Sequence, residues 1–147
     1  MALPSASFFY RYKGHRYPTG KLVEVLHRNA LVRYGGLEGV RDKSALESAL
    51  YAPISTAGGE DAYPTFFSKV AALGFRLVRN HAFHDANKRT AWLVVETTLH
   101  ANNYYISRPA IEIEDIMVMM AAGYLSIEGF RVFLLIACNQ DYTDKHL

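Results

Sequence analysis

The sequence predicts an all-α domain, and three observations support this. Four apolar residues repeat with the i, i+4, i+7, i+11 spacing of one helix face, namely Phe66, Val70, Leu73 and Leu77. Residues 91–95 are apolar on every side, which is typical of a helix buried at the centre of a domain. Glycine and proline clusters separate these segments. We therefore expect a helical bundle around a buried central helix that begins near Asn87 and follows a polar loop.

Bulk composition favours one soluble domain that does not bind nucleic acid. Half of the 147 residues are hydrophobic, and 16 basic against 14 acidic residues leave a net charge of +2. That charge is too small for binding held mainly by attraction to nucleic-acid phosphates. No apolar run reaches the roughly 20 residues of a membrane span, and no secretion signal is recognised. The lone Cys138, beside an apolar run, is expected to be buried, and we expect a cytoplasmic protein.

The chain divides into three predicted parts. Residues 1–18 are aromatic and basic without a helical period, so we expect an irregular or extended arm. Residues 19–138 form the domain, and residues 139–147 form a polar tail.

The first half of the domain contains two predicted helices. Thr19 is of a type that caps helices, and Gly35-Gly36 ends the helix that follows it. The apolar face of that helix begins with Leu22, Val25 and Leu26. Residues 37–43 are predicted to form a loop, and Ser44 is expected to cap a second, short helix.

The second half begins with a predicted long surface loop over residues 53–64, which contain two glycines and two prolines. A helix is predicted from Thr65, followed by a polar turn at residues 80–86 and a helix over residues 87–101. Two more helices fit residues 113–122 and 127–138.

Residues 81–89, with the sequence His-Ala-Phe-His-Asp-Ala-Asn-Lys-Arg, concentrate the chemistry. They lead from a loop into the N-terminus of a predicted helix, where free N–H groups and the helix dipole favour anions. Lys88 and Arg89 in the first turn oppose that dipole, so a stability-driven sequence would place acids there. A bound polyphosphate would compensate this repulsion between the two cations and the positive end of the helix dipole. The segment therefore predicts an anion site.

Each residue type in this segment has a chemical use. His81 can be neutral near pH 7 and act as a general base toward a hydroxyl. Asp85 is a hard oxygen ligand suited to Mg²⁺. Phosphate donors are available from Asn87, Lys88 and Arg89. Phe83 is expected to point into the core, and the set as a whole contains what phosphoryl-type transfer needs.

Simpler interpretations remain for single residues. His84 alone is more often a surface polar residue than a ligand, and Lys88 with Arg89 can be a solvated helix start. His81, His84 and Asp85 could also form a transition-metal site, although the i, i+3 histidine spacing on a turn is a weak signal and no further soft ligand is nearby.

Residues 81–89 resemble the signature H-x-F-x-[DE]-[AG]-N-x-R of the Fic/Doc family at every fixed position. Leu26-His27 and Arg33-Tyr34-Gly35-Gly36-Leu37 resemble the first helix and glycine stop of its death-on-curing (Doc) type, and Ala121-Ala122-Gly123 resembles the C-terminal part of that type. The resemblance spans about residues 19–138 and implies the all-α Fic fold.

The resemblance also implies roles, with ATP and Mg²⁺ as cofactors. His81 corresponds to the base that activates the target hydroxyl, and Asp85 to the Mg²⁺ ligand. Phosphate contacts fall on Asn87 and Arg89, with a backbone anion contact at Ala86.

Two positions, shared with Doc-type members, depart from the common Fic form. Lys88 stands where those proteins have glycine, and Trp92 stands in place of a second arginine, so we expect Trp92 to pack in the core. The resemblance then implies a toxin that transfers the terminal phosphate of ATP to a protein threonine or serine, in a translation factor such as elongation factor Tu. Transfer of AMP is the alternative; a non-catalytic nucleotide-binding module and a metal hydrolase are further ones.

Regulation is expected to come from a separate chain. Many Fic proteins carry an inhibitory helix marked [ST]-x-x-x-E-[GN], and the nearest match here, Thr56 to Asp61, contains Gly58-Gly59, which disfavours a helix. We therefore expect a cognate antitoxin, with a groove for an amphipathic helix on the first and third predicted helices.

Overall fold

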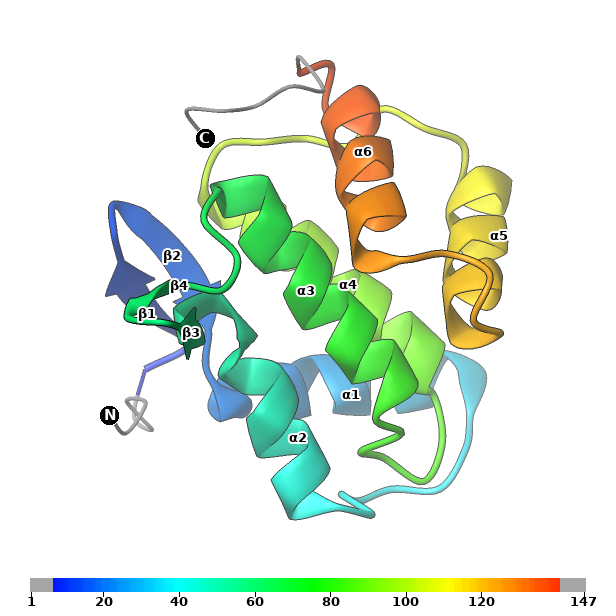
Figure 1. Cartoon of the computed structure of the whole chain (residues 1–147). Coiled ribbons are helices and arrows are strands. Elements are labelled where there is room, and N and C mark those ends of the chain that lie inside the picture. Colours follow the sequence, from blue (N-terminus) through cyan, green and yellow to red (C-terminus); the bar gives the residue numbers. More distant parts are fainter. Residues whose placement is uncertain (1–6, 141–147) are drawn as a thin grey trace.

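The computed structural model describes residues 7–140, which fold into six α-helices and two small hairpins (Figure 1). The helices are α1 (Gly20–Tyr34), α2 (Lys43–Leu50), α3 (Phe66–Arg79), α4 (Asn87–Ala101), α5 (Ala110–Ala121) and α6 (Ile127–Ala137). The predicted all-α class is confirmed. Within the described residues, no helix is both long and apolar enough to span a membrane.

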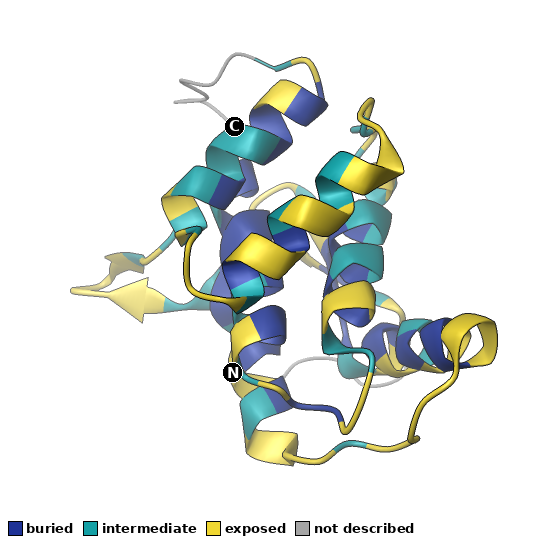
Figure 2. Ribbon diagram, turned by 90° about the vertical axis from the view of Figure 1, so that its right-hand side faces the viewer, coloured by how far each residue is buried: buried dark blue, intermediate teal, exposed yellow. Residues whose placement is uncertain are grey.

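Helix α3 is the interior helix of the domain. It packs against α2, α4, α5, α6 and the short 3-10 helix η1 (Ala52–Ile54), and most of its residues are buried (Figure 2). Gly74 allows this packing, because a Cβ there would lie 2.7 Å from a Val95 methyl group and 2.9 Å from the Phe130 ring. The four residues of the predicted apolar face, Phe66, Val70, Leu73 and Leu77, are all buried.

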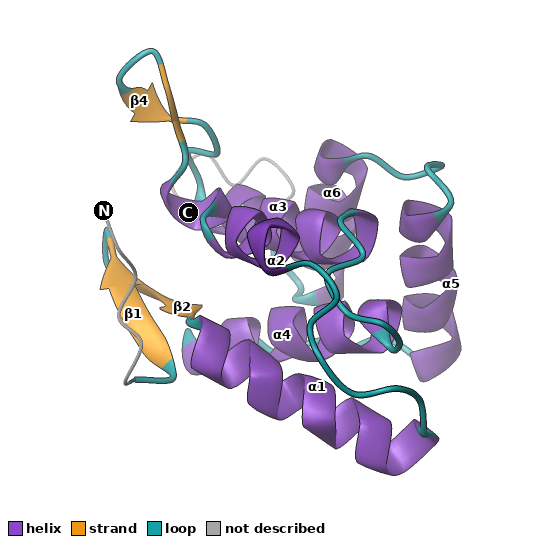
Figure 3. Cartoon of the chain, turned by 90° about the horizontal axis from the view of Figure 1, so that it is seen from below, coloured by secondary structure: helices purple, strands orange, loops and turns teal. Residues whose placement is uncertain are grey.

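The helix predicted to be central, α4, is less buried than expected. It lies between α3 and α1, which runs alongside it (Figure 3), and it also contacts α5. Ala91, Val94 and Val95 are buried, whereas Trp92 and Leu93 are only partly buried. The all-round apolar pattern of residues 91–95 therefore does not mean that α4 is enclosed on every side. Its outer side, with Trp92 and Leu93, lines a cavity described below.

Most helix ends follow the predicted signals, but α5 begins at Ala110, three residues before the predicted start at Ile113, and the cap of α2 also differs. Thr65 and Ser68 form a reciprocal capping box at the start of α3, and Gly35 ends α1 with a positive φ of 78°. The expectation that Ser44 caps α2 is wrong. Asp42 holds that position, and its carboxylate accepts the Ala45 N–H at 3.0 Å.

Part of the predicted arm is ordered as a hairpin of β1 (Phe9–Tyr12) and β2 (His15–Pro18), paired antiparallel. The arm is extended here, as one of the two predicted alternatives, but Tyr10 and Tyr17 are buried in the main core, so these residues belong to the fold of the domain. These four-residue strands are too short for a burial pattern to stand out in the sequence. Residues 1–6 and 141–147 lie outside the described part, and the three-part division of the chain remains a prediction.

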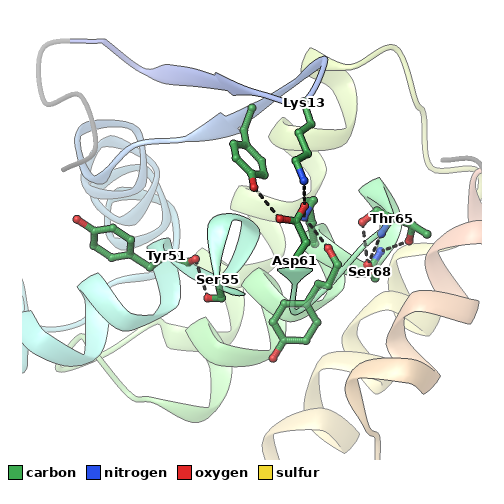
Figure 4. Close-up of polar contacts among 9 residues, drawn as sticks. Lys13, Tyr51, Ser55, Asp61, Thr65 and Ser68 are labelled. Carbon is green, nitrogen blue, oxygen red and sulfur yellow. Dashed lines mark hydrogen bonds and ion pairs between the residues drawn. The ribbon is translucent and has the colours of Figure 1, made fainter. Parts of the chain in front are cut away.

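The predicted loop over residues 53–64 contains η1 and a second hairpin of β3 (Thr56–Ala57) and β4 (Glu60–Asp61). The Asp61 carboxylate lies 2.8 Å from the Lys69 ammonium, which is 2% exposed, and accepts the Tyr12 hydroxyl at 2.7 Å (Figure 4). Lys13 adds a third contact at 2.9 Å. This polar cluster joins both hairpins to α3.

At the C-terminal end, Cys138 is buried as predicted. Burial raises the pKa of its thiol to about 11, so it is a structural residue and not a reactive one.

Candidate active site

The loop between α3 and α4 is held by a neighbouring strand-like segment. Val40 forms an isolated antiparallel bridge with Phe83, and the Arg41 N–H donates to the Ala82 carbonyl at 2.7 Å. The Arg41 guanidinium donates to the His81 carbonyl, with its Nε at 3.0 Å. This support fixes His81 in a left-handed conformation, with φ of 49°, and leaves its side chain exposed.

Phe83 anchors the loop in the core, as predicted. It is 3% exposed and stacks on the buried His27 of α1, with ring centroids 3.9 Å apart. His27 Nε2 lies 2.9 Å from the Asp85 carbonyl oxygen. Because a carbonyl only accepts, Nε2 carries the proton, and His27 connects α1 to the loop at two points.

Asp85 is oriented by the glycine turn after α1. Its Oδ2 accepts the Leu37 N–H at 2.7 Å, which leaves Oδ1 without a protein partner among the described residues. Gly36, with φ of 126°, permits this approach, because a Cβ there would lie 3.0 Å from the Asp85 Cβ. Asp85 is thus an oriented carboxylate with one free oxygen.

Asn87 closes the loop on itself. Its Oδ1 accepts the Phe83 N–H and its Nδ2 donates to the Phe83 carbonyl, both at 3.0 Å. The side chain predicted to contact phosphate therefore also has a structural task, and one Nδ2 hydrogen is left for a ligand.

The N-terminus of α4 is open. Its N-cap is Ala86, in a left-handed conformation with φ of 64°, and no side chain caps it. The first intrahelical bond runs from the Thr90 N–H to the Ala86 carbonyl, so the N–H groups of residues 87–89 have no helical acceptor. Such a terminus favours an anion.

All six predicted site residues line one pocket of about 410 Å³, called here the catalytic pocket. They are His81, Asp85, Ala86, Asn87, Lys88 and Arg89, and they are joined by His84 and by Tyr34, Gly35 and Gly36 from the end of α1. The Arg89 guanidinium lies over the Tyr34 ring, 4.2 Å from its centroid. Lys88 and Arg89 face a single carboxylate, that of Asp85, among the lining residues that the structure describes, so the pocket suits a polyphosphate with a cation.

Comparison with known proteins decides the family, because residues 17–99 match the model of the Fic/DOC family. The chain belongs to the Fic/DOC family. It is similar to Toxin Doc of Mycolicibacterium smegmatis, with 45% identity over 76 residues that cover 52% of this chain and 58% of that toxin. It is also similar to Protein kinase doc of Escherichia phage P1, with 30% identity over 104 residues that cover 71% of this chain and 81% of that kinase.

The Fic/DOC site fits Mg²⁺ by the chemistry of its donors. Mg²⁺ in phosphate-transfer sites is held by one or two carboxylates together with substrate phosphates, and Asp85 offers one oriented carboxylate with a free oxygen. The transition-metal alternative gains no support, since no three His, Cys, Asp or Glu side chains are grouped as metal ligands in residues 7–140.

Three supporting residues of this Fic/DOC site were missed as functional candidates. His27, Arg41 and Tyr34 lie 40 or more positions from the residues they contact, so spacing gave no signal for their contacts. A histidine in the apolar stripe of a helix, as at His27, was one hint, and the segments that resemble the Doc type already contained His27 and Tyr34.

The partner groove expected on the first and third helices is not formed by them. Helix α3 is enclosed by its neighbours, and its apolar residues are used in the core. A further cavity among the described residues lies instead between α1, α4 and α5. Trp92, expected in the core, is partly buried: it packs against the core and also lines that cavity.

Proposed function

We propose that this chain is a Doc-type toxin that transfers the terminal phosphate of ATP to a threonine or serine hydroxyl of a protein. One observation carries the proposal: His81, Asp85, Lys88 and Arg89 meet in one pocket at the open N-terminus of α4. The similarity to a phage protein kinase supports the same reaction class.

The proposed chemistry begins with the target hydroxyl hydrogen-bonded to the His81 imidazole, which is free of protein partners in the described residues. His81 takes the hydroxyl proton as the oxygen bonds to the terminal phosphorus. The bond from that phosphorus to the bridging oxygen breaks, and ADP leaves with the bond electrons.

Charge in this step is stabilised by groups of the pocket. Lys88, Arg89 and the free N–H groups of α4 donate to phosphate oxygens. Mg²⁺ held at Asp85 would neutralise further phosphate charge. Tyr34 keeps Arg89 in place by a cation–π contact at 4.2 Å.

Terminal phosphate transfer is favoured over AMP transfer by two residues. AMP-transferring relatives have a glycine at the position of Lys88, which leaves space there. In this chain the charged Lys88 side chain occupies that space. Trp92 provides no second guanidinium for a phosphate.

Labelling with ATP that carries the label on either the γ- or the α-phosphate tests the proposal. The purified chain is incubated with Mg²⁺, a bacterial lysate and ATP labelled at either the γ- or the α-phosphate, beside the His81→Ala variant. Protein-bound label from γ-labelled ATP alone, lost in His81→Ala, supports the kinase. Label from α-labelled ATP supports AMP transfer, and equal labelling by His81→Ala contradicts the assigned base.

The proposed biology is that of a cytoplasmic toxin held in check by an antitoxin chain. The similarity to Toxin Doc supports this, and a translation factor such as elongation factor Tu is the proposed target. Expression of the chain alone in bacteria should arrest growth and translation. Normal growth with enzyme that is active after purification would count against it.

A further inference from the structure

A buried histidine lies directly behind the loop of the catalytic pocket. His27 of α1 is 3% exposed, and it lines neither the catalytic pocket nor the cavity between α1, α4 and α5. Its Nε2 lies 2.9 Å from the carbonyl oxygen of Asp85, and its ring stacks on Phe83. A side chain in this place does not touch a bound ligand, so it can act on the reaction only through the residues that it holds.

The hydrogen bond from His27 fixes the direction of one peptide group. In a planar trans peptide, the C=O and N–H groups point in opposite directions. The carbonyl of Asp85 is turned inward, toward the buried His27. The N–H of the same peptide, which belongs to Ala86, is therefore turned away from the core, and it has no acceptor within residues 7–140. Because Ala86 lines the catalytic pocket, this N–H is available to a ligand there.

Ala86 has a backbone conformation that suits an anion and that alanine rarely adopts. Its φ of 64° and ψ of 29° are left-handed, whereas Asn87 begins helix α4. A left-handed residue next to a helical one turns successive N–H groups toward the same side, as in an anion-binding nest. The left-handed conformation is unfavourable for a residue with a Cβ, so it persists only where neighbouring groups hold it. The bond from His27 to the preceding carbonyl is one such contact.

The reverse orientation of this peptide would oppose phosphate binding. It would direct the carbonyl oxygen of Asp85, which carries a partial negative charge, into a pocket where Lys88 and Arg89 attract anions. Turning the peptide round would also leave the buried Nε2–H of His27 without its acceptor, which is unfavourable. His27 thus stabilises the orientation that offers a donor, and not an acceptor, to a phosphate.

We propose that His27 is a positioning residue, which holds the peptide between Asp85 and Ala86 so that the Ala86 N–H donates to a phosphate oxygen of the nucleotide. The inference rests on the proposed function and adds to it a core residue that the ligand does not touch. The side chain of Asp85 is oriented separately, by the Leu37 N–H. Residue 85 is therefore held at its side chain by the glycine turn and at its main chain by α1.

NMR spectra of the unmodified chain test the proposal without any transfer reaction. We expect the Nε2 resonance of His27 to be that of a protonated ring nitrogen, since this nitrogen donates to a carbonyl. We also expect the Ala86 amide proton to move downfield when inorganic tripolyphosphate is added with Mg²⁺, because the amide acquires a charged acceptor. An unprotonated Nε2 overturns the proposal, and so does an Ala86 amide that stays unchanged while tripolyphosphate binds.

Two substitutions of His27 separate its hydrogen bond from its packing. His27→Gln keeps an N–H donor near the position of Nε2 and removes the ring, whereas His27→Phe keeps a ring on Phe83 and removes the donor. In calorimetry, we expect His27→Phe to weaken tripolyphosphate binding about ten-fold, as for loss of a hydrogen bond to a charged group, and His27→Gln to keep most of the affinity. Val32→Ala, at an 87% exposed position of the same helix, should bind like the parent chain.

A role in packing alone predicts the opposite order of the variants. Weaker binding by His27→Gln than by His27→Phe overturns the proposal, as does binding by His27→Phe that equals that of Val32→Ala. If neither replacement of His27 folds, the spectra of the unmodified chain decide. Failure of the proposed function looks different, because tripolyphosphate would then bind with the expected order of variants while γ-labelled ATP labels no protein.

Discussion

Side chains in residues 81–89 divide into those that hold the loop and those that stay available to a ligand. Asn87 and Phe83 hold it, through two hydrogen bonds and a ring stacked on His27. His81 and Lys88 are exposed at the pocket without a protein partner in the described residues. The sequence does not show this division, because a family signature fixes residue types but not which of them face the backbone.

Replacement of Asn87 separates its two roles. Asn87→Ala removes both bonds to Phe83, so we expect it to lower the free energy of unfolding by about 1–3 kcal/mol, the usual cost of leaving buried backbone groups unpaired. Urea unfolding measures this loss. Lys88→Ala is the control, since its exposed side chain should affect ATP binding and not stability. Unchanged stability in Asn87→Ala would leave phosphate contact as its single role.

Gly36 sets the position of the Asp85 carboxylate. Gly36→Ala would place a Cβ 3.0 Å from the Asp85 Cβ, whereas Gly35→Ala, also at positive φ, meets nothing within 4 Å. We expect Gly36→Ala to weaken Mg²⁺-dependent activity by about ten-fold, as for other changes that displace a metal ligand. Gly35→Ala measures backbone strain alone, and equal effects of the two variants would argue against the proposed orientation.

At the scale of elements, the β1–β2 hairpin is held to α3 by the cluster around Asp61. Burial alone would raise the pKa of this carboxyl, but contacts from Lys69, Tyr12 and Lys13 outweigh it and hold the pKa well below its usual range. A depressed pKa means that the cluster stabilises the fold at neutral pH, and that this stability decreases progressively as the pH falls from about 4 toward the lower pKa of the folded state.

Removing one charge of this cluster should lower the free energy of unfolding more than removing both the Lys69 and the Asp61 charge. Lys69→Met leaves the buried Asp61 carboxylate with Lys13 as its one remaining cation among the described residues, beside the Tyr12 hydroxyl, and we expect the free energy of unfolding to fall by about 3 kcal/mol. The double variant Lys69→Met with Asp61→Asn should recover much of it and lose the acid sensitivity. Chemical denaturation at pH 7 and at about pH 2.5, well below the ordinary pKa of an aspartate, checks both, and additive losses would contradict the account.

Elements were largely predictable where local signals dominate. Thr65, Gly35 and the apolar spacing of α3 placed helix ends and faces correctly. The sequence did not predict the β1–β2 hairpin, whose four-residue strands acquire their order from burial of Tyr10 and Tyr17 against distant helices. Formation of such short strands depends on long-range packing, which the periodicity of the sequence does not show.

At the scale of the whole molecule, the loop of the catalytic pocket joins the interior helix α3 to α4. A rigid helix at the core thus presents the loop, while α1 and the segment around Arg41 support it from two other directions. The catalytic pocket itself was predictable, because its six expected residues are contiguous or nearly so. The cavity between α1, α4 and α5 was not, since these helices meet there only through the fold.

The most direct test of the central claim is the mass of a modified target. A bacterial strain expressing the chain, beside one expressing His81→Ala, is lysed and its translation proteins are analysed by mass spectrometry. We predict an added mass of about 80 Da, one phosphate, on a threonine or serine in the first strain alone. An added mass of about 329 Da, one AMP, or the same modification with His81→Ala, would contradict it.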